Sequence, residues 1–187
     1  MKRAVIVVDM LVDNIGDTAR PGIGQQAAAM LPKLQWLLAV ARERGWPVVY
    51  ACDSFFPEDF IFRGRMQPHA LRGTPGAAVV ELLRPQPQDL VLEKRLFSAF
   101  ARTDLDLTLR YKNIEEVGIT GVSTPYCVLQ TALDAVGNGF RAAILEDCCA
   151  AHSAEVHRAT LEIYRKNPLY PLLRVVGAED FLAEKES

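Results

Sequence analysis

The sequence predicts an α/β fold, a three-layer α/β/α sandwich with a mostly parallel central sheet, formed by one domain over residues 1–187. Short runs rich in Val and Ile alternate with helical stretches of ten or more residues, and such spacing favours parallel strand pairing. The strand runs are almost continuously apolar, as expected where helices cover both faces of a sheet. The chain length of 187 residues suits one ordinary domain.

The first part of the chain predicts two buried strands with a helix between them. Residues 4–8 (AVIVV) and 47–51 (PVVYA) are short apolar runs typical of buried strands. Residues 22–44 are rich in Ala and Leu with helical spacing, and Gly45 is a typical helix stop. Because Pro32 lies inside this stretch, either the helix starts there or two helical pieces meet there.

The middle of the chain is less regular. Residues 52–75 combine Pro, Gly and charge over a length that is typical of a functional loop. A short helix is expected over 76–83, and Pro85 and Pro87 end it. A third strand is expected over 90–92. Residues 103–110 form the next expected helix, with Thr103 as its N-cap.

The last part of the chain returns to regular alternation. Strands are expected at 117–122 (VGITGV), 142–145 and 172–176, and helices at 126–136 and 154–166. This completes a pattern of six strands separated by helices or loops.

Composition and charge exclude several classes of function. Lys plus Arg is 21 and Asp plus Glu is 23, so no excess positive charge favours a nucleic-acid partner. No apolar stretch of about 20 residues could span a membrane, and the apolar run before Asp9 is too short for a signal peptide. The cysteines lack the spacing of a zinc site or a secreted disulfide framework. We expect a cytoplasmic, reduced protein that acts on a small molecule.

Polar side chains follow three of the predicted strands. Asp9 ends the first strand, Lys94 ends the third, and Cys127 follows the fourth at the start of a helix. Ligands bind at the carboxyl ends of strands in open parallel sheets, so we expect the three to converge in one cleft. The helix dipole and Lys94 would favour the Cys127 thiolate, and Asp9 could take the thiol proton and return it to a leaving group. The trio predicts amide or imide hydrolysis through a thioester.

Each of these residues also has a structural interpretation. Cys127 could be a small buried hydrophobe, and Asp9 could cap a turn. Lys94 lies in the charged run 93–95, which could be a solvated edge. The joint placement at three strand ends weakens these structural interpretations but leaves them open.

Four segments match a known pattern in the same order along the chain. They are 7–10 (VVDM), 69–77 (HALRGTPGA), 93–100 (EKRLFSAF) and 121–135 (GVSTPYCVLQTALDA). On these segments the chain resembles the isochorismatase-like cysteine hydrolase superfamily, whose members include nicotinamidases, N-carbamoylsarcosine amidohydrolase and ureidoacrylate amidohydrolase. The resemblance extends over residues 3–176.

The resemblance implies a role for each matching residue. Asp9, Lys94 and Cys127 match the catalytic triad of the superfamily. A cis peptide between Val122 and Ser123 is implied, with the N–H groups of Ser123 and Cys127 as the oxyanion hole. Isochorismatase itself cleaves a vinyl ether and lacks the nucleophilic cysteine, so Cys127 places the chain with the amidohydrolases. The implied activity is cysteine-dependent cleavage of a C–N bond in a small amide, ureido or carbamoyl compound.

The chain also departs from the superfamily pattern. Leu11 and Asn14 replace a Gln and an aromatic residue of the first motif, so Asn14 is expected to line the substrate pocket. Nicotinamidases bind a metal through Asp-x-His and a later His. Here Asp53 and His69 match the outer ligands, but Phe55 replaces the middle one. Two ligands suit a metal poorly, so we expect no metal or other cofactor, with Asp53, Phe55 and His69 in the pocket.

Other interpretations remain open at this stage. The departures could mark a catalytically silent small-molecule binder with the same fold. Cys148 and Cys149, placed after the fifth strand, could carry redox chemistry, and His152 or His157 could pair with the nucleophile. The aromatic loop 55–62 could cover the pocket or form a subunit contact, and we expect a homo-oligomer.

Overall fold

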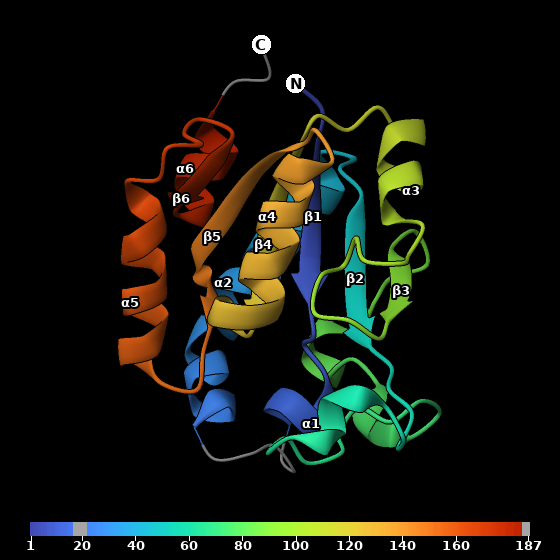
Figure 1. Cartoon of the computed structure of the whole chain (residues 1–187). Helices are drawn as coiled ribbons and strands as arrows, with labels where there is room; N and C mark the ends of the chain where they lie inside the picture. Colours follow the sequence, from blue (N-terminus) through green and yellow to red (C-terminus); the bar gives the residue numbers. More distant parts are fainter. Residues whose placement is uncertain (17–21, 185–187) are drawn as a thin grey trace.

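A six-stranded parallel sheet forms the centre of the computed structural model, which describes residues 1–16 and 22–184 (Figure 1). Every neighbouring pair of strands is parallel, in the order β3-β2-β1-β4-β5-β6. The strands are β1 (Arg3–Val8), β2 (Val48–Asp53), β3 (Leu90–Lys94), β4 (Glu116–Val122), β5 (Arg141–Ala150) and β6 (Leu173–Val176). The predicted α/β fold with a parallel sheet is confirmed.

Helices cover both faces of this sheet (Figure 1). The α-helices are α1 (Val12–Ile15), α2 (Ile23–Glu43), α3 (Leu105–Tyr111), α4 (Leu129–Gly137), α5 (Ala154–Arg165) and α6 (Ala178–Ala183). Apolar side chains of α2 and α6 pack in one core cluster, and those of α3, α4 and α5 pack in the cluster on the other face. Strand residues alternate between the two clusters, which is why the strand sequences are apolar throughout.

Several sequence-based expectations need correction. The helix α2 is continuous through Pro32, because burial of Leu34, Leu37 and Leu38 on the sheet outweighs the local cost of the proline. The helix expected over 76–83 is absent. Its place is taken by two 3₁₀ turns, Pro75–Ala77 and Glu81–Leu83, because the backbone between them pairs with Leu11 instead of closing helical hydrogen bonds.

The strand β5 extends beyond its predicted end and includes Cys148 and Cys149. Successive residues of a strand face opposite sides of the sheet, and the two cysteines accordingly lie in opposite core clusters. A disulfide between them has no suitable geometry, which removes the basis for redox chemistry at this pair.

A close approach between β1 and β4 sets the position of the strand ends. Gly121 pairs with Val8 and has φ +103°, and a Cβ on Gly121 would lie 2.0 Å from the Val8 carbonyl oxygen. Only glycine fits this contact. The chain that leaves β4 therefore passes directly beside Asp9, the residue that follows β1.

The carboxyl ends of the strands lie together at one end of the molecule, at the bottom of Figure 1, where α1 and the turns of segment 54–83 are gathered. The other end of the sheet carries the start of β1 and the helix α6. None of the helices within the described residues is long and apolar enough to cross a membrane.

Candidate active site

A buried charged cluster joins the ends of β1, β2 and β3. The Nζ of Lys94 donates hydrogen bonds to Oδ2 of Asp9 (2.8 Å) and to Oδ1 of Asp53 (2.5 Å). The side chain of Lys94 is fully buried, and those of Asp9 and Asp53 are 2% and 6% exposed. Register explains the contact, because Asp53 and Lys94 are paired neighbours on β2 and β3. The Asp53 N–H also donates to Oδ1 of Asp9 (2.8 Å), so both oxygens of that carboxylate are held.

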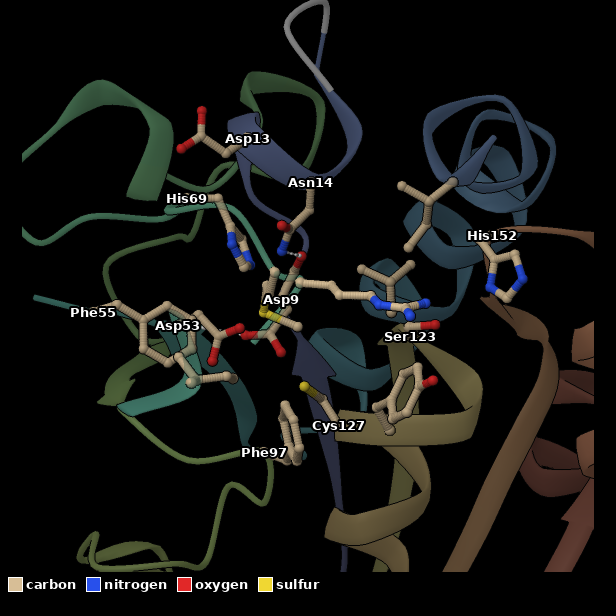
Figure 2. A pocket seen from close by; sticks show the side chains of 16 residues that line it. Asp9, Asp13, Asn14, Asp53, Phe55, His69, Phe97, Ser123, Cys127 and His152 are labelled. Atoms are coloured by element: carbon tan, nitrogen blue, oxygen red, sulfur yellow. Dashed lines mark hydrogen bonds between the residues drawn. The ribbon is translucent and has the colours of Figure 1, made fainter. Parts of the chain in front are cut away.

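Cys127 completes the cluster from the β4 side. Its Sγ and the carboxylate oxygens of Asp9 and Asp53 lie within 4.8 Å of one another. In Figure 2 the thiol points toward these two carboxylates. The structure thus brings Asp9, Lys94 and Cys127 together as the sequence predicted, and it adds Asp53, which was expected only to contact substrate.

The turn that carries Cys127 differs from the regular helix that was expected to start near Tyr126. A π-helical turn spans Thr124–Val128 and continues into α4. Such turns are rare and occur frequently at functional sites. The peptide bond between Val122 and Ser123 is cis. The Ser123 carbonyl accepts hydrogen bonds from the N–H groups of Tyr126 and Val128, which fixes the start of the turn.

The environment of Cys127 favours the neutral thiol. Burial raises the pKa of the Cys127 thiol well above its ordinary value, the charge of Asp9 raises it further, and Lys94 only partly opposes this. The sequence-based argument considered Lys94 and the helix start, which favour the thiolate, whereas burial and Asp9 have the larger effect on the pKa of Cys127. A neutral thiol beside a carboxylate is arranged to transfer its proton during attack.

The carboxylates and the ammonium group also perturb one another. Burial and the neighbouring charge of Asp9 raise the pKa of Asp53 to about 7. Burial alone would lower the pKa of Lys94, but the charge of Asp9 and the charge and hydrogen bond of Asp53 outweigh it and raise that pKa. Lys94 therefore stays charged, while Asp53 exchanges a proton near neutral pH.

A pocket of about 510 Å³ opens above Cys127. Figure 2 shows Phe55 and His69 on the side of the pocket opposite Ser123 and His152, with Phe97 near the thiol. The lining side chains are Asp9, Asp13, Asn14, Ile23, Asp53, Phe55, Ile61, Arg65, Met66, His69, Phe97, Val122, Ser123, Tyr126, Cys127 and His152. All four predicted pocket residues, Asn14, Asp53, Phe55 and His69, are among them.

Some roles differ in detail from the sequence-based expectation. Asn14 lines the pocket, but its Nδ2 donates to the Asp9 carbonyl (2.9 Å), so it also fixes the backbone of the triad aspartate. His157 lies behind the nucleophile turn, where its Nδ1 is 2.8 Å from Oγ1 of the buried Thr124. Arg65, Phe97 and His152 were not expected as a set, because they come from three segments whose convergence no local pattern indicates.

The residues present do not fit the nicotinamidase-type metal site. Phe55 is buried and offers no ligand, and Asp53 is occupied by Lys94. His69 directs Nδ1 to the Gln67 carbonyl (3.0 Å) and packs edge-on against Phe55. The donor atoms of Asp9, Asp53 and Cys127 could surround one ion, but the Lys94 ammonium already supplies the positive charge there.

Comparison with known proteins agrees with this geometry. Residues 3–173 match the family model of the isochorismatase domain. The chain belongs to the isochorismatase family. This confirms the family and the hydrolase class that the four sequence segments indicated.

The relatives of the chain include several amidases. It is 36% identical to the nicotinamidase/pyrazinamidase of Mycobacterium tuberculosis over 87% of this chain and 94% of the relative. It is 28% identical to maleamate amidohydrolase of Pseudomonas putida over 86% of this chain and 78% of the relative. The crystal structure of N-carbamoylsarcosine amidase from Thermoplasma acidophilum superposes with a TM-score of 0.82 at 32% identity, covering 100% of both chains.

Proposed function

We propose that this isochorismatase-family hydrolase is a cysteine-dependent amidohydrolase that cleaves a C–N bond of a small amide, ureido or carbamoyl compound. One observation carries the proposal: a thiol and two carboxylates lie within 4.8 Å of one another, with an ammonium on both carboxylates, at the base of a pocket of about 510 Å³. The relatives named as amidases support the same bond class.

Acylation begins with the neutral Cys127 thiol. As Sγ forms a bond to the substrate carbonyl carbon, its proton passes to Asp9, and the carbonyl electron pair moves to oxygen. The N–H groups of Ser123 and Cys127 stabilise this oxyanion. The intermediate collapses with cleavage of the C–N bond, and Asp9 returns the proton to the departing nitrogen. Ammonia or an amine leaves, and a thioester remains on Cys127.

Deacylation uses the same groups in reverse order. Water attacks the thioester carbonyl while Asp9 takes one of its protons. Collapse of the second intermediate breaks the C–S bond, and the proton passes from Asp9 to sulfur. The products are an acid and an amine or ammonia, so each cycle consumes one water.

Lys94 and Asp53 position the proton acceptor. The Lys94 ammonium holds Oδ2 of Asp9 and the Asp53 backbone N–H holds Oδ1, so the carboxylate keeps one orientation through both proton transfers. Asp53 in turn fixes Lys94 from the opposite side. Both residues act through Asp9 and need no bond to the substrate.

Ammonia release tests this function across a panel of small amides, ureido acids and carbamoyl compounds. Wild-type protein is expected to release ammonia, and Cys127→Ala is expected to lose at least about 10⁴-fold in kcat while keeping its fold. A thioester on Cys127, seen by mass spectrometry after acid quench, would locate the nucleophile. Cys148→Ala is the matched control, because Cys148 is equally buried but lies on the far face of β5, and it should retain activity.

Two outcomes would overturn the proposal. Full activity in Cys127→Ala would exclude the cysteine mechanism. Binding of panel compounds without turnover or covalent adduct would instead indicate a silent small-molecule binder with this fold.

A further inference from the structure

The pocket holds a cation that the proposed chemistry does not use. Arg65 lines the pocket together with Ser123 and Cys127. No hydrogen bond, ion pair or ring contact joins Arg65 to another side chain among residues 1–16 and 22–184. Nearby arginines behave differently: Arg63 lies over the Phe60 ring, and Arg72 forms a salt bridge with Glu93.

The carboxylates around this cation are already occupied. Asp9 and Asp53 are both hydrogen-bonded to Lys94. Asp13 accepts a hydrogen bond from the Ala70 N–H (2.8 Å), and its carboxylate points away from Cys127 in Figure 2. None of the carboxylates in the described part of the pocket therefore forms an ion pair with the Arg65 guanidinium.

Two other side chains that line the pocket, His69 and Asn14, offer hydrogen-bond acceptors. Because a carbonyl oxygen can only accept, the contact of His69 Nδ1 with the Gln67 carbonyl places the ring proton on Nδ1 and leaves Nε2 of the neutral ring as an acceptor. Asn14 uses Nδ2 as a donor to the Asp9 carbonyl, which leaves Oδ1 as an acceptor. The pocket thus offers two acceptors suited to the N–H groups of an amide or urea.

We infer that Arg65 binds a carboxylate of the substrate, so that the substrate is an amide, ureido or carbamoyl acid and not a neutral amide. The inference rests on the proposed function and names its substrate class. Arg65 is exposed to solvent at the pocket, where a carboxylate can reach it, and a guanidinium binds a carboxylate through two parallel hydrogen bonds. A single positive charge matches one carboxylate, whereas a doubly charged phosphate would also meet Asp9 and Asp53 nearby.

Matched substrate pairs test this assignment. The kcat/KM values of succinamate and its methyl ester, and of N-carbamoylglycine and its amide, are measured for wild type, Arg65→Gln, Arg65→Lys and Arg63→Gln. Wild type is expected to prefer the charged member of at least one pair by tenfold or more. Arg65→Gln should lose about 10- to 100-fold on that charged member, mainly through KM, with the neutral member unchanged. Arg65→Lys should recover part of the loss.

Arg63→Gln is the control, since Arg63 lies on the same loop but does not line the pocket, and it should behave as wild type. Equal losses on charged and neutral substrates in Arg65→Gln, or a wild-type preference for the neutral members, would overturn the inference while leaving the amidohydrolase in place.

A binding measurement separates the two proposals. Succinate, a dicarboxylate product analogue, is titrated calorimetrically into wild type and Arg65→Gln without any turnover. Weaker binding to Arg65→Gln, by about tenfold or more, is expected even if no amide of the panel is hydrolysed. Equal binding to the two proteins overturns the role of Arg65, whatever the activity assays show.

Discussion

The two ends of the central sheet each bury a cluster of charged side chains, and the two clusters differ in charge balance. At the amino end, Arg3 on β1 and Arg174 on β6 both contact the Glu116 carboxylate on β4, with Nε–Oε2 and Nη2–Oε1 distances of 2.8 Å and 2.6 Å. Glu184 also contacts both arginines. Among these four side chains, two guanidinium groups thus contact two carboxylates.

The carboxyl end has no such balance. Asp9 and Asp53 share the single cation of Lys94, and the Cys127 thiol lies beside them. The pKa values reflect the difference: the hydrogen bond from Arg174 lowers the pKa of Glu184, whereas burial and Asp9 raise that of Asp53 to about 7. A balanced buried cluster stabilises the fold with fixed charges, while an unbalanced one keeps protons that can move.

Among the changes that test this comparison, neutralising Asp9 is expected to have the largest effect. Asp9→Asn removes the proton acceptor, so turnover should fall by about 10³-fold. The same change removes a charge that raises the pKa of Cys127, so the thiol should react with iodoacetamide roughly tenfold faster at pH 8. Opposite changes in turnover and alkylation would be specific to the unbalanced cluster. Asp13→Asn, in the same pocket, should change both by less than about threefold, and parallel losses in Asp9→Asn would contradict the scheme.

The balanced cluster predicts a loss of stability without loss of chemistry. Glu116→Gln removes one of the two carboxylates that contact the Arg3 and Arg174 guanidinium groups. The free energy of unfolding should therefore fall by about 3–5 kcal/mol. The kcat of the remaining folded protein should match wild type. Urea unfolding and active-site-normalised kinetics measure the two quantities, and a stability change below about 1 kcal/mol would show that the pairing contributes little.

Asp53 predicts how stability changes with pH. Folding raises its pKa from the ordinary 3.8 to about 7, so between these values the native state holds a proton that the unfolded chain has released. The stabilisation is fully present below about pH 4 and is lost as pH rises through about 7, by at most about 4 kcal/mol. Asp53→Asn should flatten this decline in urea unfolding curves recorded from pH 4 to 8. An unchanged slope would place the titration elsewhere.

The smallest effect is expected from Thr124, which lies behind the turn that carries Cys127 and belongs to neither charged cluster. Thr124→Val removes the hydroxyl that contacts His157 Nδ1, and one such hydrogen bond contributes about 1 kcal/mol. The expected result is a three- to tenfold lower kcat with KM unchanged, because the turn carries Cys127 but the pocket wall is intact. Thr124→Ser, which keeps the hydroxyl, should recover most of the rate. A change in KM alone would indicate a different role.

The sequence was informative where one segment decides the outcome. Apolar runs identified the strands, and Asp9, Lys94 and Cys127 stood out because each follows a strand. The contact of Asp53 with Lys94 depends on the register between β2 and β3, which no single segment encodes. The direction of the Cys127 pKa shift depends on burial and on two carboxylates from other strands.

Long-range packing explains the remaining differences. Pro32 interrupts helical hydrogen bonding locally, yet the sheet-facing side of α2 keeps the helix continuous. Arg65 lies in the predicted functional loop 52–75, but without periodicity no local feature distinguished it as a residue that lines the pocket. Both outcomes depend on which distant surfaces meet.

The two ends of the loop that follows β2 are joined by an isolated β-bridge between Phe55 and Leu71. The N–H of Phe55 donates to the Ala70 carbonyl, and the Arg72 N–H donates to the Phe55 carbonyl, so the ends of segment 56–70 are held together. This segment supplies Ile61, Arg65, Met66 and His69 to the pocket, whereas the cysteine and its partners come from strand ends and the turn after β4. Segment 56–70 can therefore be exchanged as a unit in enzyme engineering. Libraries that graft loops of other lengths and charges between Phe55 and Leu71 would change the pocket wall while leaving Asp9, Lys94 and Cys127 in place.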